Sequence, residues 1–150
     1  MLQIENVVSD RGSRYAVSGG PVAGRQGVDA FLTELKRTKK YAKATHNTWA
    51  AVLSEGGAQK GDDGEAGAGA VILRMLERAG LTDHVVVVTR WYGGVHLGGD
   101  RFAHVVTCVR AYLDALQKAG SAFRQGAEGR HARHPARRGA ALCQYSPVVM

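Results

Sequence analysis

Residues 83–101 read DHVVVVTRWYGGVHLGGDR, and this stretch decides the fold more than any other. The four consecutive valines at 85–88 are β-branched and apolar at every position, a pattern typical of a short strand that is buried on both faces. An arginine and two large aromatic residues follow, and four glycines then allow the backbone to turn sharply. Asp100 precedes an amphipathic run and can cap a helix. The stretch therefore predicts a buried strand, a glycine-rich turn and a helix, which form either a purely structural unit or a binding site at the turn.

The segments on either side of this stretch alternate between strand and helix patterns. Apolar residues spaced three and four apart predict helices, whereas short apolar runs bounded by turn residues predict strands. Such an alternation after an initial pair of strands favours an α+β fold in which helices cover one face of a sheet. Residues 18–24 are expected to form a loop, and residues 54–64 a loop or a hairpin. Strands are expected at residues 3–8, 13–17, 48–53 and 84–89, and helices at 26–37, 65–79 and 101–117.

Length and composition favour one domain with a true hydrophobic core. The chain has 150 residues, of which 45% are hydrophobic, so disulfides are not needed for stability. Cys108 and Cys143 lie far apart and neither belongs to a CxxC pair, which argues against a zinc site of that type. No apolar run approaches the 18 residues of a membrane span, and no signal-peptide pattern is present. The sequence therefore predicts a cytoplasmic protein without a membrane partner, and it indicates no cofactor.

The net charge of +7 is concentrated in two places, and the C-terminal tail is the first. Residues 120–150 contain five arginines and one glutamate, are rich in Gly, Ala and His, and lack an apolar period. This composition predicts a disordered tail of residues 120–150 after a folded domain of residues 1–119. The tail is either a solvated extension or an electrostatic tether to RNA.

The second concentration of positive charge lies at the end of the first predicted helix and just beyond it. Positive side chains complement the negative end of a helix dipole, which explains some of these residues but not all of them. The basic residues that the dipole does not explain favour contact with the phosphates of RNA. The basic patch consists of Lys36, Arg37, Lys39, Lys40 and Lys43.

Polar side chains also gather before two of the predicted elements. His46 and Asn47 precede the strand that carries Trp49, and residues 62–65 place three carboxylates at the start of a helix. Carboxylates at a helix start favour the dipole and cap free N–H groups, but they can also bind a cation or a partner's basic side chain. The nearby glycines lack the GxxxxGK[ST] pattern of a phosphate-binding loop. A metal-dependent enzyme would draw its ligands from His46, Asp62, Asp63, Glu65 and His96.

Strand ends and helix starts cluster at one edge of an α/β layer, so we expect these polar groups to converge with the end of the valine strand. Arg90 is the expected partner of the carboxylates, because an arginine can fork onto Asp62, Asp63 or Glu65. Trp91 and Tyr92 are the expected binding anchors, because aromatic residues dominate interface hot spots. The candidate binding surface is Thr45, His46, Asn47, Asp62, Asp63, Glu65, Arg90, Trp91, Tyr92, Gly93 and Gly94.

Three of these motifs, in this order along the chain, resemble the Impact family, which includes the bacterial YigZ-type proteins. The motifs are ATHN at 44–47, DDGEAG at 62–67 and the run from 86 to 98 that contains RWYGG. The segment DRF at 100–102 is similar to the eukaryotic Impact branch, and DRGS at 10–13 resembles the turn after the first strand of that family. The resemblance covers about residues 8–117 and implies a fold like domain IV of elongation factor G, a two-layer α/β sandwich with a four-stranded sheet and helices on one face.

The resemblance implies regulation of translation without catalysis. Eukaryotic Impact proteins bind the ribosome-associated activator of the starvation kinase in general amino-acid control and so restrain phosphorylation of an initiation factor. Ribosomes and actin are further partners that the family implies. The eukaryotic proteins also carry an N-terminal RWD domain, for which we expect no room in this chain. An RNA-binding module is the alternative function, and a metal-dependent small-molecule enzyme is a weaker one.

Overall fold

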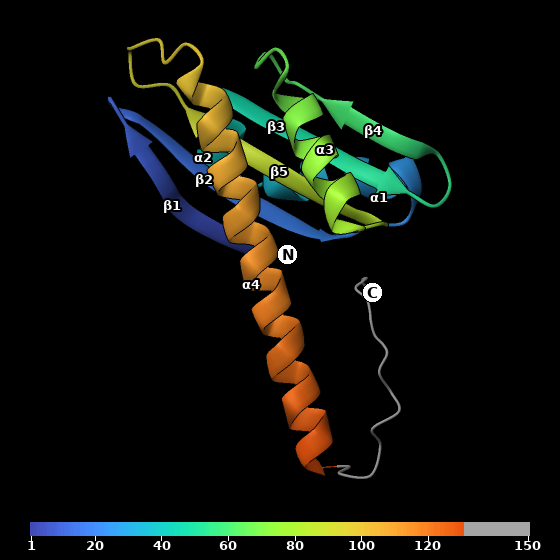
Figure 1. Cartoon of the computed structure of the whole chain (residues 1–150). Coiled ribbons are helices and arrows are strands. Elements are labelled where there is room, and N and C mark those ends of the chain that lie inside the picture. Colours follow the sequence, from blue (N-terminus) through green and yellow to red (C-terminus); the bar gives the residue numbers. More distant parts are fainter. Residues whose placement is uncertain (131–150) are drawn as a thin grey trace.

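The computed structural model describes residues 1–130, with side chains described for residues 1–120. After the first two strands, helical and strand segments alternate as the periodicity predicted, except that a second helix follows α1 and a second strand follows β3 (Figure 1). The elements are β1 (Leu2–Asp10), β2 (Ser13–Pro21), α1 (Gly24–Leu35), α2 (Lys39–Ala42), β3 (His46–Leu53), β4 (Gly57–Gly61), α3 (Ala68–Ala79), β5 (His84–Trp91) and α4 (Asp100–Arg130).

The strands form one antiparallel sheet in the order β1-β2-β5-β3-β4. The valine strand β5 is therefore central, with β2 on one side and β3 on the other, and the expectation of a strand buried on both faces is confirmed. The predicted α+β class is confirmed as well. The expected sheet of four strands is corrected to five, because the segment around residues 57–61 pairs with β3 as an edge strand. The hairpin alternative for residues 54–64 was therefore the right one.

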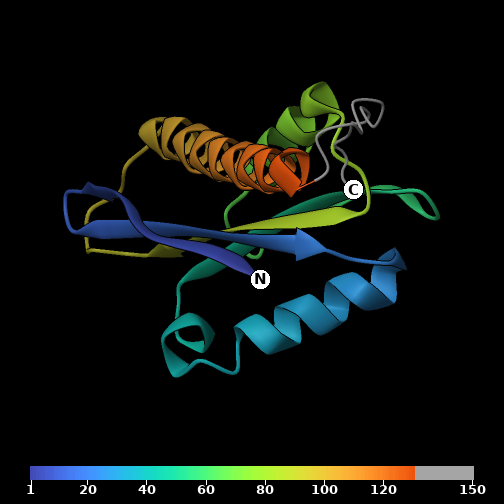
Figure 2. The ribbon, with the colours of Figure 1, turned by 90° about the horizontal axis from the view of Figure 1, so that it is seen from below.

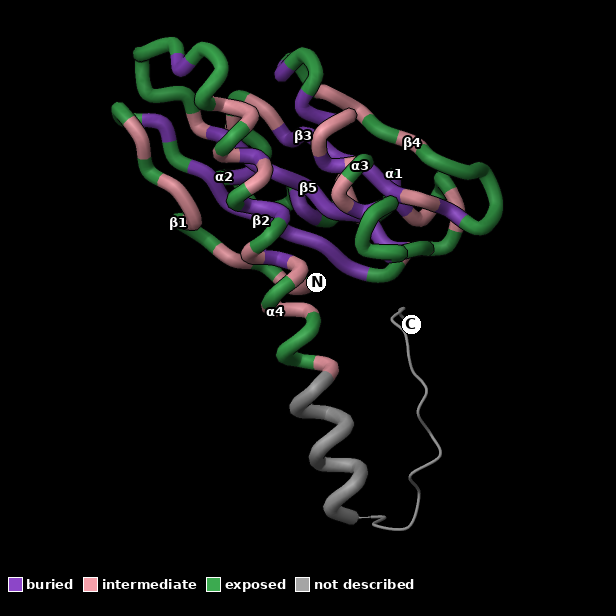
Figure 3. The backbone as a smooth tube through the Cα atoms, viewed as in Figure 1, coloured by how far each residue is buried: buried purple, intermediate pink, exposed green. Residues whose placement is uncertain are grey.

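Helices cover both faces of the sheet, which corrects the expected two-layer sandwich to three layers. Figure 2 shows α3 and α4 on one side of the sheet and α1 and α2 on the other. Each side has its own apolar cluster, and the strand alternation divides the valines between them. Val86 and Val88 pack toward α3 and α4, whereas Val85 and Val87 pack toward α1 and α2. Figure 3 shows buried residues along the central strands β2, β5 and β3.

Strand β2 is longer than the sequence predicted, and one short helix was not predicted. β2 continues to Pro21, whereas residues 18–24 were expected to form a loop. Two glycines of β2 allow aromatic rings to pack directly on the strand. A Cβ on Gly19 would collide with the ring of Tyr112, and a Cβ on Gly20 would lie 3.2 Å from the ring of Phe31. The short helix α2 was not expected, because four residues are too few to show a helical period.

Helix α4 continues past the expected domain boundary at Ala119 and ends at Arg130. Residues 120–130 are thus helical, contrary to the disorder expected for them. Extending a helix that is already formed adds one hydrogen bond per residue, so this segment can continue α4 without a core of its own, although three of its eleven residues are glycine. The rest of the tail, residues 131–150, lies outside the described residues. Within residues 1–130, no helix combines the length and apolar character needed to cross a membrane.

Candidate functional site

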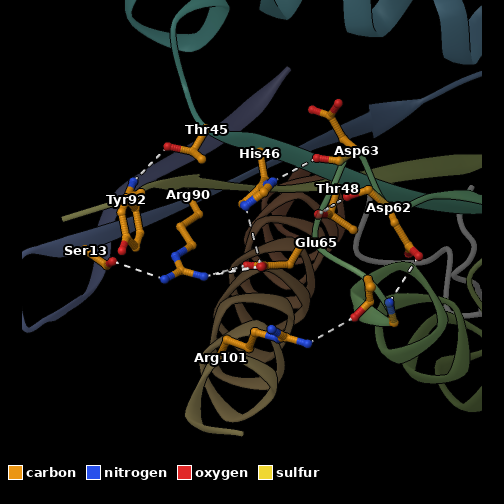
Figure 4. Close-up of polar contacts among 12 residues, drawn as sticks. Ser13, Thr45, His46, Thr48, Asp62, Asp63, Glu65, Arg90, Tyr92 and Arg101 are labelled. Atoms are coloured by element: carbon orange, nitrogen blue, oxygen red, sulfur yellow. Dashed lines mark hydrogen bonds and ion pairs between the residues drawn. The ribbon is translucent and has the colours of Figure 1, made fainter. Parts of the chain in front are cut away.

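A buried ion pair lies where β5, β3 and the segment before α3 meet (Figure 4). Arg90 at the end of β5 donates from Nη1 to both carboxylate oxygens of Glu65, at 3.0 and 3.2 Å. Both side chains are 6% exposed, so each charge depends on the other for compensation. The expected arginine–carboxylate pair is therefore present, and Glu65 is the carboxylate that Arg90 contacts.

Arg90 also has polar and aromatic neighbours from other elements. Its Nη2 lies 3.4 Å from the Ser13 hydroxyl, and its guanidinium carbon lies 5.8 and 5.6 Å from the ring centres of Tyr15 and Tyr92. Among the described residues, no hydrogen-bond partner is present for Arg90 Nε or for the buried Tyr15 hydroxyl. Burial raises the pKa of Tyr15 to about 12, so this phenol remains neutral near pH 7. The guanidinium thus lies within 6 Å of the centres of two aromatic rings.

His46 is directed at the ion pair by the segment before α3. Its Nδ1 lies 2.8 Å from the carbonyl oxygen of Asp63, and because a carbonyl only accepts, Nδ1 must carry a proton. Its Nε2 then faces Glu65 Oε1 at 3.6 Å. A second proton on the ring would place another cation beside Glu65. The expected convergence of His46, Glu65 and Arg90 is therefore observed.

Asp62 and Asp63 hold the local backbone instead of joining the charged pair. Asp62 accepts hydrogen bonds from the backbone N–H groups of Gly67 and Gly69 at 3.1 and 2.8 Å, and these bonds lower its pKa. Asp63 accepts from the backbone N–H of Asn47 at 2.8 Å. Asp62 thus satisfies one free N–H in the first turn of α3, that of Gly69, but the helix begins at Ala68 and not at the expected residue 65, and no acid lies in its first turn. The orientation of Glu65 and the position of the segment both depend on these contacts.

The loop after β5 is fixed to the rest of the site at two points. The backbone N–H of Tyr92 donates to Thr45 Oγ1 at 2.9 Å, and that of Gly93 donates to Ser13 Oγ at 3.2 Å. Gly93 packs against the turn between β1 and β2, where a Cβ would collide with the backbone of Gly12 and Ser13. Glycine is required at 93 for this close approach.

The fixed loop presents apolar side chains to solvent. Tyr92 is 42% exposed and Val95 is 45% exposed, and the Tyr92 ring tilts against His96 with 5.5 Å between ring centres. Gly94 has a φ of +94° with open space around it, so this turn position favours glycine for its backbone conformation. The loop is thus a small apolar projection on a constrained backbone.

Two residues of the expected surface lie on the other face of the sheet. Trp91 packs edge-on against Tyr41, with 5.2 Å between ring centres, and donates from Nε1 to the carbonyl of Lys40 at 3.0 Å. Asn47 is buried between the carbonyl of Tyr41 and the hydroxyl of Thr89. Successive residues of a strand point to opposite faces, so Trp91 cannot share a face with Arg90, nor Asn47 with His46. The expectation that all these residues converge on one surface is therefore wrong for Trp91 and Asn47.

The side chains considered as metal ligands do not form a common group. His96 lies on the loop against Tyr92, whereas Asp62 faces the start of α3. In the described part of the chain, no cluster of three or more His, Cys, Asp or Glu side chains is arranged to hold a metal ion. Two of the five candidate ligands, His46 and Glu65, do approach each other, with 3.6 Å between Nε2 and Oε1.

Ser13 and Tyr15 contact the guanidinium of Arg90 but were not predicted as site residues. The turn that contains Ser13 matched a family motif, and that match was the available signal for it. Nearby, His104 Nε2 lies 2.7 Å from Asp10, and Arg11 lies 2.6 Å from Asp100, so the same turn is also tied to α4. Hydrogen bonds from Arg11 and His104 hold the pKa of Asp10 well below its usual range. Contacts over such sequence separations leave no periodic signal.

The basic patch lies on the opposite face of the sheet from the ion pair, around α2. Lys36 is the C-cap of α1, and Lys39 and Lys40 lie in the last turn of α2, so helix dipoles explain some residues of the patch, as expected. Lys40 pairs with Glu5 at 2.9 Å, and Arg37 lies 3.4 Å from Glu34. The patch is therefore partly neutralised by two acids.

Most of the described chain is similar in sequence to known proteins. A family model for the Impact N-terminal domain matches residues 11–113. Protein IMPACT of Bos taurus is 40% identical over 111 residues, covering 71% of this chain and 35% of that protein. The Protein IMPACT homolog of Caenorhabditis elegans is 36% identical over 114 residues, covering 71% of this chain and 44% of that protein. The chain thus spans about a third of the length of the mammalian relatives it matches.

Two solved structures are also similar to this chain. One, described only as a hypothetical protein, is 25% identical with a TM-score of 0.55, over 78% of this chain and 56% of its own. The other is the two-domain translational regulator Yih1, which is 33% identical with a TM-score of 0.44, over 69% of this chain and 42% of its own.

Proposed function

The chain belongs to the Impact family, and on this premise we propose that it regulates translation in the cytoplasm by binding a protein partner and not by catalysis. Regulation of translation is what the family motifs imply. The proposal of binding without catalysis is supported by the site itself. Its charged groups Arg90, Glu65 and Asp62 are paired with one another or with backbone N–H groups, and the large hydrophobic side chains that it exposes are Tyr92 and Val95.

The exposed pair Tyr92 and Val95 is the observation that carries this proposal. Apart from Met1 they are the only large hydrophobic residues that are exposed among the described residues. An aromatic residue on a constrained loop loses little conformational freedom on binding, which is the usual property of an interface hot spot. The first residues of the loop, Tyr92 and Gly93, are held by Thr45, Ser13 and Gly12, so this end of the loop is positioned before a partner binds. The docking loop, residues 92–97, is therefore the proposed contact surface.

The buried pair of Arg90 and Glu65 supports the docking loop. Arg90 lies beneath the Tyr92 ring and donates toward Ser13, which also accepts from Gly93. Losing one member of a buried ion pair leaves an uncompensated charge, so the pair enforces one arrangement of β5, Glu65 and the loop. On this proposal its role is to position the loop. It does not contact a substrate.

The partner is proposed from the family resemblance. It is the ribosome-associated activator of the starvation kinase, with restraint of initiation-factor phosphorylation as the consequence, and ribosomes and actin are the further candidates. On this proposal, binding of the activator at the docking loop would link starvation signalling to the rate of translation initiation.

The test is affinity purification of the tagged full chain, with and without RNase. We expect a protein partner that is retained after RNase treatment and lost in Tyr92→Ala and Val95→Ser, each weakening association by about 2 kcal/mol. Gln117→Ala, an exposed substitution on α4, is the control and should leave capture unchanged. Capture that survives both loop substitutions, with folding verified by circular dichroism, would contradict the proposal.

A thermal-shift scan across divalent metals separates binding from catalysis. A metal-dependent enzyme gains stability from its metal through ligand linkage. Stabilisation that disappears in Asp62→Ala but persists in Tyr92→Ala would reject the docking role and favour the enzyme.

A further inference from the structure

A second surface, on the α1–α2 face of the sheet, is more basic than the sequence indicated. Arg14 in β2 lies directly opposite Trp91 in β5, and residues that face each other across an antiparallel pair share a face. The Trp91 ring in turn lies beneath Lys40, with the ammonium nitrogen 5.3 Å from the ring centre. Arg14 therefore extends the basic patch across the sheet from α2.

Most of this charge is unpaired and accessible. Lys36, Lys39, Lys43 and Arg14 are all exposed, and in the described residues none of them takes part in an ion pair. Lys40 and Arg37 have acidic partners, as described above, and these are exposed pairs of the kind that contribute little. Four free cations thus surround α2 and the adjoining end of the sheet.

The chemistry of the surface favours phosphate over a folded protein. The aromatic residues beneath it are turned inward: Tyr41 is buried, and Trp91 uses its indole N–H on the carbonyl of Lys40. No exposed large hydrophobic residue lies among the cations in the described chain. Protein interfaces are depleted in lysine and rely on apolar or aromatic anchors, whereas lysines serve well as point contacts to phosphate oxygens.

We propose that Arg14, Lys36, Lys39, Lys40 and Lys43 form a contact surface for the phosphate backbone of RNA. Such contacts follow charge and not base sequence, so the surface binds RNA without strong sequence preference. It lies across the sheet from the docking loop, as Figure 2 shows for α1 and α2 relative to α4. The inference does not rest on the proposed function, because RNA and a protein partner would use different faces.

The experiment measures binding of the full chain to a short fluorescein-labelled single-stranded RNA of mixed sequence by anisotropy. The variant Lys39→Glu/Lys43→Glu is compared with Arg74→Glu/Arg110→Glu, which changes net charge equally on exposed positions of α3 and α4. Because both variants retain the C-terminal arginines, a contribution from the tail is the same in each. Titrations between about 50 and 200 mM salt give the number of phosphate contacts from the salt dependence.

We expect the α2 variant to lose about tenfold in affinity and its log–log salt slope to become shallower by about 1.4, which is 0.7 for each lost contact to a single strand. The control pair should lose less than about threefold, as expected for long-range charge alone. Lys39→Gln/Lys43→Gln, which removes charge without adding acid, should give the same order of effects if the glutamate variant does not fold.

Three results would overturn the inference. Equal losses in the two charge-matched variants would assign binding to net charge or to the tail. Competition by polyglutamate as effective as that of unlabelled RNA would identify an acidic protein segment as the ligand. Absence of RNA binding by the unaltered chain would remove the basis of the proposal. Tyr92→Ala should bind RNA normally, so failure of the docking loop as a partner site would leave this test unaffected.

Discussion

The side chain of His84 is buried, which the sequence alone did not predict. It lies at the start of β5, and its Nε2 is 2.6 Å from the hydroxyl of Tyr112 on α4. Burial disfavours the imidazolium and lowers the pKa of His84 to about 4, from an ordinary value of 6.5. The folded protein therefore holds this histidine neutral over a pH range in which the unfolded chain binds a proton.

The consequence is a loss of stability on acidification. The contribution of His84 is complete above pH 6.5 and decreases as the pH falls toward 4, because only the unfolded state gains a proton in that window. At 1.36 kcal/mol per pKa unit, the contribution is roughly 3 kcal/mol. Urea unfolding of the natural chain and of His84→Gln between pH 7 and 4.5 measures this effect. The natural chain should lose more stability than the variant, and identical pH profiles would contradict the pKa shift.

Among the elements, the loop after β5 and the turn between β1 and β2 are in backbone contact. Gly93 and Gly12 meet without side chains between them, and Ser13 connects the two segments by accepting from the N–H of Gly93. This contact anchors the docking loop at its first residues. The glycine pair in the RWYGG motif has two different functions, because Gly93 is needed for space and Gly94 for its positive φ.

Gly93→Ala should therefore destabilise the protein and displace the docking loop. The added Cβ meets backbone atoms, which cannot move aside as a flexible side chain would, and overpacking of this kind costs about 1–3 kcal/mol or more. Gly99→Ala is the matched control, since a Cβ there has open space and no positive φ. It should change the free energy of unfolding by less than about 1 kcal/mol. Equal effects of the two substitutions in denaturant unfolding would show that the contact with Gly12 is not important.

For the whole molecule, the central sheet joins two apolar clusters into one structure. β5 contributes Val86 and Val88 to one cluster and Val85 and Val87 to the other. Neither helical layer can detach without exposing valines of the same strand. The α1–α2 layer, which carries the basic patch, and the α3–α4 layer are thus expected to unfold together.

Two core substitutions test this coupling. Ile72→Ala in α3 and Leu35→Ala in α1 remove buried side chains on opposite faces and should each cost about 2–5 kcal/mol. Because the sites share no contacts in either cluster, their effects should add within about 0.5 kcal/mol in the double variant. Fluorescence of the tryptophans and far-UV circular dichroism should give coincident transitions. Separate transitions for the two probes in Leu35→Ala would show that the α1–α2 layer unfolds by itself.

The amino-acid sequence by itself determined the local elements and part of the site. Hydrophobic period and glycine position predicted β5 and the main helices, because these signals depend on residues near one another in the chain. The valine run even contained the information for a third layer, since a strand buried on both faces needs cover on both. The contact of Arg90 with a carboxylate was predicted from residue chemistry, and of the acids before α3, Asp62 satisfies one free N–H in the first turn of that helix.

Only the tertiary structure decided which side chains share a face and which partner each one takes. Strand alternation separates Trp91 from Arg90 and Asn47 from His46, although they are neighbours in the chain. Ser13 and Tyr15 reach the guanidinium from β2 because antiparallel pairing places that strand beside β5. The same pairing adds Arg14 to the basic patch. Strand β4 forms because its backbone pairs with the edge of β3. These outcomes depend on pairing and packing between distant segments, for which a linear sequence carries no periodic signal.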